Sequence, residues 1–314
     1  MEGARKPIVV VGSINMDLVA NTPRIPLAGE TILGRDFQTH HGGKGANQAV
    51  AVGRLGYPVS MIGRVGDDAF GTELRAGLES AGVDTTGVAT SSGASGVAVI
   101  VVAESGENSI VVIPGANAHV TPADLDANIE MIRSAGMVLA QLEIPLETVL
   151  HLARICAREN VPLILDPAPA AKLPAELLKN VTWFTPNETE AAFFIGDPSN
   201  STKESPEIAK SLMNKGIRGV VLKLGARGAY LASPDGAMAS IQPFRVRAVD
   251  TTAAGDCFNG AFAVGLLMGK DHAESARFAA AAAAISVTRV GAQSSMPALN
   301  EVLDMLIGKL NATS

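Results

Sequence analysis

Five short, predominantly apolar runs recur along the chain, and segments with a helical pattern separate them. The runs are "PIVVVGS", "VSMIGRVG", "GMVLAQLE", "VPLILDPAP" and "GVVLKLG". Continuous apolar strands that alternate with helices are typical of a parallel sheet covered on both faces. The sequence therefore predicts an α/β fold, in which ligands collect at the carboxyl ends of the strands.

Two segments break this alternation and have the pattern of strands and turns. They are "AGETILGRDFQTHHGG" and "GVAVIVVAESGENSIVVIPGA", and the second predicts a hairpin. The hairpin strand from Val97 to Val102 is apolar on both faces, so a partner is expected to cover the second face. We therefore predict a small β lid, residues 14–41 and 93–117, which is also the expected dimer contact. The alternative is two extra strands on the main sheet.

The composition restricts the class of function. The net charge is −6 and aromatic residues make up only 4% of the 314 residues, so neither a basic surface nor stacking rings favour nucleic-acid binding. A phosphate ligand would have to be neutralised locally, by backbone amides, one or two lysines, or metal ions. Two cysteines are too few for a disulfide framework, and no run reaches transmembrane length. We expect a reduced, cytoplasmic protein that does not bind membranes.

The stretch "DTTAAGDCFNGAF", from Asp250 to Phe262, combines very small residues with a carboxylate at the start of an apolar helical run. Small residues let a ligand approach the backbone, and the first amides of a helix are unpaired donors at the positive end of its dipole. A phosphate would suit this position, and Asp256 beside it could accept a proton.

Two further motifs precede helices or follow strands. In "HGGKGANQA", Lys44 and Asn47 could hold one ligand, although a plain glycine-rich turn explains the motif equally well. The pattern lacks the spacing of a Walker A loop, and no G-x-G-x-x-G fingerprint indicates a dinucleotide. In "VGSINMD", Asn15 and Asp17 could face neighbouring hydroxyls of a sugar, or they could cap a turn.

Two motifs lie in the second half of the chain. In "TPNETEA", Asn187 and Glu190 share one helix face, where the acid could hold hydrated magnesium or complete a capping box. In "LKLGARGAY", Gly225 and Gly228 would let a nucleotide lie against the backbone, but alone the motif is only a hairpin.

Together these motifs resemble the PfkB carbohydrate kinase family over nearly the whole chain. "GGKGANQA" fits the first family signature, and the stretch from Asp250 to Phe262 fits the second at every constrained position. "GSINMD", "QLE" around Glu143 and "GANA" from Gly115 are similar to the ribose-phosphorylating members more than to the fructose, adenosine or phosphofructose kinases.

The resemblance implies a three-layer α/β/α fold with a mostly parallel central sheet and a small β-sheet lid. The α/β part would comprise residues 1–13, 42–92 and 118–314. The implied activity is ATP-dependent phosphorylation of D-ribose at its 5-hydroxyl, with Mg²⁺, activation by K⁺, and a homodimer joined through the lids.

The resemblance also implies roles for individual residues. Asp256 would be the catalytic base, and an anion hole would be formed by the amides of Ala253, Ala254 and Gly255. Ribose would be held by Asn15, Asp17, Gly43, Lys44, Asn47, Glu143 and Asp256. ATP would be bound by Asn187, Lys223, Leu224, Gly225, Ala226, Arg227, Gly228, Gly255, Asp256 and Ala280. Glu190 would belong to the magnesium shell, and the monovalent-cation site would comprise Asp250, Thr252, Ser286, Arg289, Gly291 and Ser295.

Two positions depart from the family pattern. Lys223 replaces an expected threonine near the nucleotide, and Ala280 replaces a larger polar residue beside the adenine. The competing hypotheses are another sugar or nucleoside kinase of the same family and a non-catalytic sugar or nucleotide sensor. The dipole of the helix predicted to begin near Asp256 is expected to keep the Asp256 carboxylate ionised.

Overall fold

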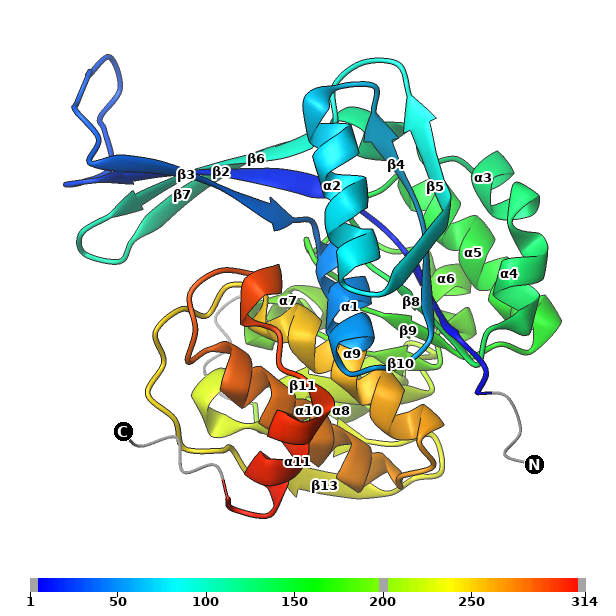
Figure 1. The fold of residues 1–314 in the computed structure, drawn as a ribbon. Helices are drawn as coiled ribbons and strands as arrows, with labels where there is room; N and C mark the ends of the chain where they lie inside the picture. Colours follow the sequence, from blue (N-terminus) through cyan, green and yellow to red (C-terminus); the bar gives the residue numbers. More distant parts are fainter. Residues whose placement is uncertain (1–4, 198–202, 310–314) are drawn as a thin grey trace.

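A nine-stranded sheet forms the centre of the computed structural model, which describes residues 5–197 and 203–309 (Figure 1). Its strands lie in the order β13-β12-β11-β10-β9-β8-β1-β4-β5, and all neighbours from β11 to β5 are parallel. Only β12 and β13 add as antiparallel strands. The strands are β1 (Ile8–Val11), β4 (Val59–Gly66), β5 (Val83–Ser91), β8 (Met137–Ala140), β9 (Leu163–Leu165), β10 (Trp183–Phe184), β11 (Gly219–Lys223), β12 (Ala229–Ala232) and β13 (Met238–Ile241).

Helices cover both faces of this sheet, so the predicted three-layer arrangement is confirmed. One face carries α1 (Lys44–Arg54), α2 (Ala69–Ser80), α9 (Ala254–Leu267), α10 (His272–Ser286) and α11 (Leu299–Leu306). The other face carries α3 (Pro122–Ala127), α4 (Ile129–Ser134), α5 (Leu146–Glu159), α6 (Ala175–Asn180), α7 (Glu188–Ile195) and α8 (Ser205–Met213). None of the helices in the two described ranges is long and apolar enough to cross a membrane.

Strand β1 shows why the apolar runs are continuous. Ile8 and Val10 pack into the core on the α1 and α9 side, whereas Val9 and Val11 pack into the core on the opposite side. All four side chains are fully buried. A strand with helices on both faces has no solvent-facing position, so an alternating pattern cannot develop.

The alanine-rich segment lets two helices of the first layer approach closely. Ala276, Ala279 and Ala282 of α10 are fully buried, and α10 packs along α9. At Gly265 of α9, a Cβ atom would lie only 3.0 Å from the Cα atom of Ser275. Small side chains therefore set the distance between these helices.

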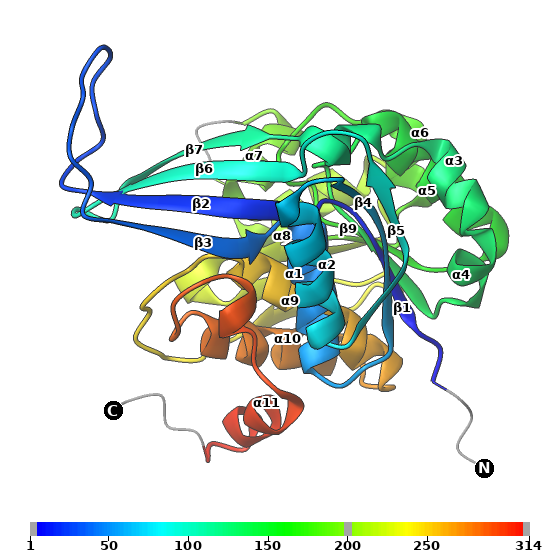
Figure 2. The ribbon, with the colours of Figure 1, turned by 45° about the horizontal axis from the view of Figure 1, so that its top comes forward.

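A separate four-stranded sheet projects from the large one, as Figure 2 shows. It has the order β3-β2-β6-β7, and its strands are β2 (Asn15–Thr22), β3 (Asp36–Gly42), β6 (Gly96–Ala103) and β7 (Asn108–Ile113). The predicted hairpin corresponds to β6 and β7, which pair antiparallel. The alternative of two extra strands on the main sheet is therefore wrong, because within the described residues β6 pairs with β2 and β7, and β7 pairs with β6.

Asn117 anchors the base of the small sheet. Its side-chain Oδ1 atom accepts a hydrogen bond from the backbone amide of Ile14 at 2.9 Å, and its Nδ2 group donates to Asn15 Oδ1 at 2.7 Å. At Gly96 a Cβ atom would lie within 2.2 Å of the Asn15 side-chain oxygen, so only glycine fits there. The start of β2 is thereby fixed where it leaves the main sheet.

Candidate active site

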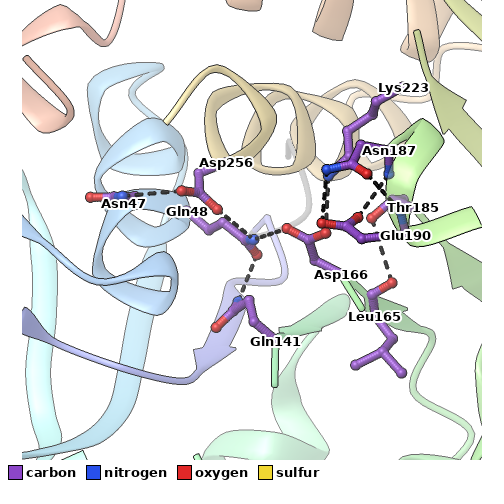
Figure 3. Close-up of polar contacts among 10 residues, drawn as sticks. All are labelled: Asn47, Gln48, Gln141, Leu165, Asp166, Thr185, Asn187, Glu190, Lys223 and Asp256. Carbon is purple, nitrogen blue, oxygen red and sulfur yellow. Dashed lines mark hydrogen bonds and ion pairs between the residues drawn. The ribbon is translucent and has the colours of Figure 1, made fainter. Parts of the chain in front are cut away.

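Polar residues follow the carboxyl ends of neighbouring strands in the main sheet. Ser13 lies just after β1, Gln141 after β8 and Asp166 after β9, and Lys223 ends β11. Helices α1 and α9 meet above this edge, and they bring Asn47, Gln48 and Asp256 to it (Figure 3). The site therefore occupies the edge at which parallel sheets gather ligands.

Four carboxylates raise the pKa of one partly buried lysine, Lys44, at the start of α1. Burial alone would lower the pKa of Lys44, but the charges of Asp256, Asp166, Glu143 and Glu190 outweigh it and raise this pKa. Glu143 also accepts a hydrogen bond from the Lys44 backbone amide at 3.1 Å. Lys44 is therefore held as a cation among acids, and carboxylates so arranged can accept hydrogen bonds from the hydroxyl groups of a sugar.

Asp17 is the most perturbed acid of this group. Burial raises its pKa from 3.8 to about 7, and the negative charges of Glu143 and Asp256 add to the effect. Gly42 lies opposite, where a Cβ atom would come within 2.4 Å of the Asp17 carboxylate. A ligand that donates hydrogen bonds to Asp17 would favour its ionised form.

The glycine-rich turn before α1 is required by close packing. Gly43, the N-cap of α1, has φ +86°, and a Cβ atom there would lie 2.7 Å from the backbone nitrogen of Asn15. At Gly45 a Cβ atom would lie 2.7 Å from the backbone of Ser13. The turn thus does more than reverse the chain, because it presses the start of α1 against β2 and puts Lys44 among the acids.

Asp256 is buried in the first turn of α9 and is held by two amides of α1. Asn47 donates to one carboxylate oxygen at 3.0 Å and Gln48 to the other at 3.1 Å. Burial raises the pKa of Asp256 from 3.8 to about 6, with Lys44 and the two amides opposing and Asp166 adding to the rise. The expectation that the helix dipole governs this group was incomplete, because burial has the larger effect. At neutral pH the carboxylate is still mostly ionised.

The backbone before Asp256 has the geometry of an anion site. Ala253, the N-cap of α9, adopts a left-handed conformation with φ 57°, which is rare for a residue with a side chain. The amide of Ala254 donates a long bond of 3.3 Å to the Thr251 carbonyl. Among the described residues, none accepts a backbone hydrogen bond from the amides of Gly255 or Asp256. Two helix N-terminal donors are thus open to a ligand.

A cavity of about 590 Å³ opens beside these amides. Its walls come from the turn after β11, the segment 243–248, the start of α9 and the middle of α10. The predicted nucleotide residues Lys223, Gly225, Ala226, Gly228, Gly255 and Ala280 all line it. The remaining wall was not predicted from the sequence and is formed by Pro243, Phe244, Arg245, Val246, Ala248, Thr251, Phe258, Ala283, Ala284 and Val287. Thr251 and Phe258 belong to the motif from Asp250 to Phe262, whereas the others are mostly apolar and lie in no recognisable motif.

Four predicted nucleotide residues lie outside this lining, and Asp256, in the first turn of α9, is one of them. Asn187 caps α7, and Leu224 packs against the core of the opposite face. Arg227 is exposed and pairs with Glu188. The cavity therefore uses the glycines of the turn rather than its larger side chains.

Lys223 reaches inward rather than toward solvent. Its Nζ atom lies 2.9 Å from Asp166 Oδ1, in a pair whose side chains are only 13% and 3% exposed. The same Nζ atom would lie 3.3 Å from a Cβ atom placed on Gly255. The ammonium group therefore lies directly beside the predicted anion hole.

Glu190 has the capping role that the sequence left open. One carboxylate oxygen accepts from the Asn187 backbone amide at 2.8 Å and the other from the Asn187 side chain at 2.9 Å. Burial raises the pKa of Glu190, and the nearby cation of Lys223 opposes this rise. Among the described residues, no group of three or more His, Cys, Asp or Glu side chains could hold a metal ion.

Two of the predicted monovalent-cation residues, Thr252 and Gly291, contact Asp250. Its carboxylate accepts from the Thr252 amide at 2.9 Å and from the Gly291 amide at 2.8 Å. Burial would raise the pKa of Asp250, but these hydrogen bonds hold it below its usual value. The hydroxyls of Ser286 and Ser295 donate to backbone carbonyls of their own segments, whereas Arg289 is directed to Glu301.

The sequence analysis gave no role to several residues of the site. Ser13 donates to Glu143, and Gln141 donates to Gln48 at 2.7 Å. Gln48 lies inside the "GGKGANQA" motif, in the second turn of α1. A side-chain amide in an apolar helix does not by itself indicate a role in a functional site. Asp166 directly follows the apolar strand β9, and that position is the one signal in the sequence that could indicate a role for it.

Comparison with known proteins agrees with this geometry. Residues 5–299 match the pfkB family of carbohydrate kinases. The chain is 45% identical over 300 residues to the ribokinase of Bacillus subtilis, covering 95% of this chain and 99% of that protein. It is 43% identical over 303 residues to the ribokinase of Haemophilus influenzae, covering 96% and 99%. Its structure matches that of Arabidopsis thaliana ribokinase complexed with ribose and ATP, with a TM-score of 0.88, 37% identity and coverage of 96% and 98%. The chain therefore belongs to the pfkB family of carbohydrate kinases.

Proposed function

We propose that this chain is a ribokinase, which transfers the γ-phosphoryl group of ATP to the 5-hydroxyl of D-ribose. One observation carries the proposal. The buried carboxylate of Asp256 lies between a cluster of acids suited to a polyhydroxyl sugar and a cavity of about 590 Å³ whose wall includes the open amide of Gly255. A base, an acceptor site and a phosphate site thus meet at one residue.

The sugar would lie among Asn15, Asp17, Lys44, Asn47 and Glu143. Carboxylates accept hydrogen bonds from sugar hydroxyls, and the ammonium group of Lys44 donates one. Bound hydroxyls would favour the ionised form of Asp17, because hydrogen bonds to a carboxylate lower its pKa. The 5-hydroxyl would then face Asp256, since Asp256 is the carboxylate shared by the acid cluster and the anion hole.

In the transfer step the 5-hydroxyl oxygen forms a bond to the γ-phosphorus, and the bond from that phosphorus to the β–γ bridging oxygen breaks. The hydroxyl proton passes to Asp256, and ADP leaves. Phosphoryl transfer has a loose transition state, so positioning and charge neutralisation account for most of the catalysis. The amides at the start of α9 and the ammonium group of Lys223 supply positive charge where the phosphoryl group passes.

The residues fit a Mg²⁺ ion that is carried largely by the ATP phosphates. Glu190 already accepts two hydrogen bonds from Asn187, so it is better placed to bind a water of the magnesium shell than the ion itself. Bound magnesium would supply further neutralisation of the phosphate oxygens.

A K⁺ ion fits the residues around Asp250. One carboxylate and a loop rich in backbone oxygens, drawn together by the hydrogen bond from Gly291 to Asp250, provide the oxygen ligands that a hard cation prefers. Thr252, Ser286, Arg289, Gly291 and Ser295 would contribute mainly through their backbone. A cation there would add positive charge to the segment that leads into α9.

The small sheet would act as a lid over the sugar, and it would also join two subunits. The lid comprises residues 14–41 and 93–117. Val99 and all four residues from Ile110 to Ile113 are apolar and 39–59% exposed. An apolar sheet surface of this kind favours a partner, and a second lid offers a matching one. Sedimentation equilibrium of Val111→Lys tests this, because a monomeric variant is expected beside a dimeric wild type.

The state of the two cysteines supports a cytoplasmic location. Cys156 and Cys257 are both free thiols buried in the core. We therefore place the enzyme in the cytoplasm, where thiols stay reduced.

A coupled assay of ADP formation tests the proposed function. We expect turnover with D-ribose to exceed that with a panel of other pentoses, 2-deoxyribose, fructose and nucleosides, and to increase when K⁺ replaces Na⁺. ATP hydrolysis without sugar should be slow, since a closed lid excludes water. Higher kcat/KM for a nucleoside or hexose would contradict the assignment to ribose, and tight ribose binding without turnover would instead indicate a sensor.

A further inference from the structure

One buried glutamine contacts two acids of the site at the same time. Gln48, on α1, is only 1% exposed. Its Nε2 group donates one hydrogen bond to Asp256 Oδ1 at 3.1 Å and another to Asp166 Oδ2 at 3.2 Å. Asp256 lies in the first turn of α9 and Asp166 follows β9, so a single side-chain amide joins two distant parts of the chain (Figure 3).

A second glutamine fixes the orientation of this amide. Gln141, which is fully buried after β8, donates from its Nε2 group to Gln48 Oε1 at 2.7 Å. If the Gln48 amide turned over, its oxygen would face two carboxylates and its NH₂ group would face another donor. Both contacts would be repulsive in a buried site. Gln141 therefore keeps both N–H groups of Gln48 directed at the acids.

We infer that Gln48 is a positioning residue for phosphoryl transfer, which holds the Asp256 carboxylate at a fixed place relative to the nucleotide side of the site. This inference rests on the proposed function. Asp256 is the one proposed sugar contact that it involves, because none of the hydrogen bonds of the Gln48 side chain involves Asn15, Asp17, Lys44 or Glu143.

The contacts of Gln48 continue to the nucleotide cavity. Asp166 accepts from Lys223 at 2.9 Å, and Lys223 lines the cavity. The backbone supports the same arrangement, because a Cβ atom on Gly260 of α9 would lie 2.9 Å from the carbonyl oxygen of Gln48. Helices α1 and α9 are thus in close contact at Gln48, and a shift of either helix would break the hydrogen bond to Asp256.

Opposing charges around Asp256 make the role measurable. Lys44 on α1 lowers the pKa of Asp256, and so do the hydrogen bonds from Asn47 and Gln48. Asp166 after β9 raises it, and Asp17 on β2 is a further negative charge that interacts with it. Removing Gln48 should therefore raise the pKa of Asp256, whereas neutralising Asp166 should lower it. General loosening of the site would move both variants in one direction.

Carbon-13 NMR titration of the aspartate carboxyl groups, in protein free of sugar and nucleotide, measures this directly. The resonance of Asp256 is identified by its loss in Asp256→Asn. We expect Gln48→Met to raise the pKa by about one unit and Asp166→Asn to lower it. Gln141→Met should raise it less, because it frees the Gln48 amide without removing it. Gln38→Met, at an exposed glutamine of β3, is the matched control.

Kinetics provide the second readout. We expect Gln48→Met to lower kcat by roughly 10- to 100-fold with a ribose Kd within about three-fold, because misplacing a catalytic group affects the transition state more than binding. Opposite pKa shifts in Gln48→Met and Asp166→Asn, together with this kcat effect, support the inference. An unchanged pKa in both Gln48→Met and Gln141→Met, shifts of the same sign in Gln48→Met and Asp166→Asn, or a ribose Kd that rises as much as kcat falls would overturn it. A wild type inactive on every sugar would refute the proposed function, and the NMR titration would still decide whether Gln48 controls Asp256.

Discussion

Replacing Asp256 by asparagine separates the charge of this side chain from its shape. The amide has nearly the same volume and can still accept the hydrogen bond from Gln48, but it cannot take the proton of the sugar hydroxyl. We expect kcat to fall by roughly 10²- to 10⁴-fold, the usual contribution of a general base. The ribose Kd should stay within several-fold, because Asn15, Asp17, Lys44 and Glu143 remain.

The same substitution should make the protein more stable at neutral pH, and the size of this gain in the free energy of unfolding follows from the burial of Asp256. Burial, with the charge of Asp166, raises the pKa of Asp256 from 3.8 to about 6. A shift of about two units corresponds to about 3 kcal/mol between the two protonation states. Asparagine avoids this cost, but its NH₂ group faces that of Asn47, and the lost hydrogen bond offsets about 1 kcal/mol. The variant should gain about 2 kcal/mol near pH 7.5.

The sign of the effect depends on pH. Since the folded pKa of Asp256 lies above the unfolded value of 3.8, its contribution to wild-type stability is fully present below pH 3.8 and is lost as the pH rises through about 6. The stability gain of Asp256→Asn should therefore shrink when unfolding is measured near pH 5.

Urea unfolding at pH 5 and pH 7.5, beside the coupled assay and ribose binding by calorimetry, tests the whole argument. The matched control is Asn47→Asp, which keeps the volume of the neighbouring amide and adds a charge, so it should destabilise the fold at pH 7.5. Turnover of Asp256→Asn close to wild type would remove the assignment of the base. Lower stability than wild type at both pH values would show that burial does not govern this carboxylate.

Three other variants test separate parts of the site. Gly255→Val should lower kcat/KM for ATP by more than about 100-fold with unchanged ribose binding, because the side chain would fill the space beside Lys223 Nζ where phosphate approaches. Gly255→Ala is the milder control. Full activity of the valine variant in the coupled assay would contradict the backbone anion hole. Lys223→Met should destabilise the protein by up to about 3 kcal/mol, because it leaves Asp166 buried without its partner. In thermal unfolding, the double variant Lys223→Met with Asp166→Asn should recover most of this lost stability. An equal loss of stability in the single and the double variant would disprove a paired buried charge. The raised pKa of Asp17, about 7, predicts that the wild type binds ribose more tightly as the pH rises from 6 to 8, and Asp17→Asn should abolish this pH dependence of the ribose Kd. A wild-type Kd that does not change over this range would refute the role of the ionised form.

The elements with the strongest local signals could be predicted from the sequence. The buried strands β1, β8 and β9 are recognisable because both faces are apolar, and the hairpin of β6 and β7 because its turn lies between two apolar runs. The two-residue strand β10 has no periodicity that a sequence could reveal. It is a strand because its neighbours β9 and β11 hydrogen-bond to it on both sides.

In the candidate site, too, residues with a local role could be predicted from the sequence and residues without one could not. Gly43, Lys44 and Asp256 belong to motifs whose residues act on their immediate neighbourhood, such as a helix start or a close backbone approach, so the residue types indicate the chemistry. Gln48 and Gln141 have no such local role, and nothing in their own segments predicts that one would donate to the other. Asn187 and Arg227 lie in the expected loops, but Asn187 caps α7, Arg227 pairs with Glu188, and neither lines the cavity.

By itself, the sequence determined the α/β class, the family and the residues at the start of α1 and α9, because hydrophobic pattern, glycine and helix termini act over a few residues. Only the tertiary structure decided which acids share a space, that Lys223 pairs with Asp166, and that burial raises the pKa of Asp256 and Asp17. These properties depend on the distance between segments that are far apart in the chain, as in the hydrogen bond from Asn47 to Asp256 across 209 residues, and on the exclusion of water from between them. Neither the distance between the segments nor the exclusion of water can be inferred from a short segment of the sequence.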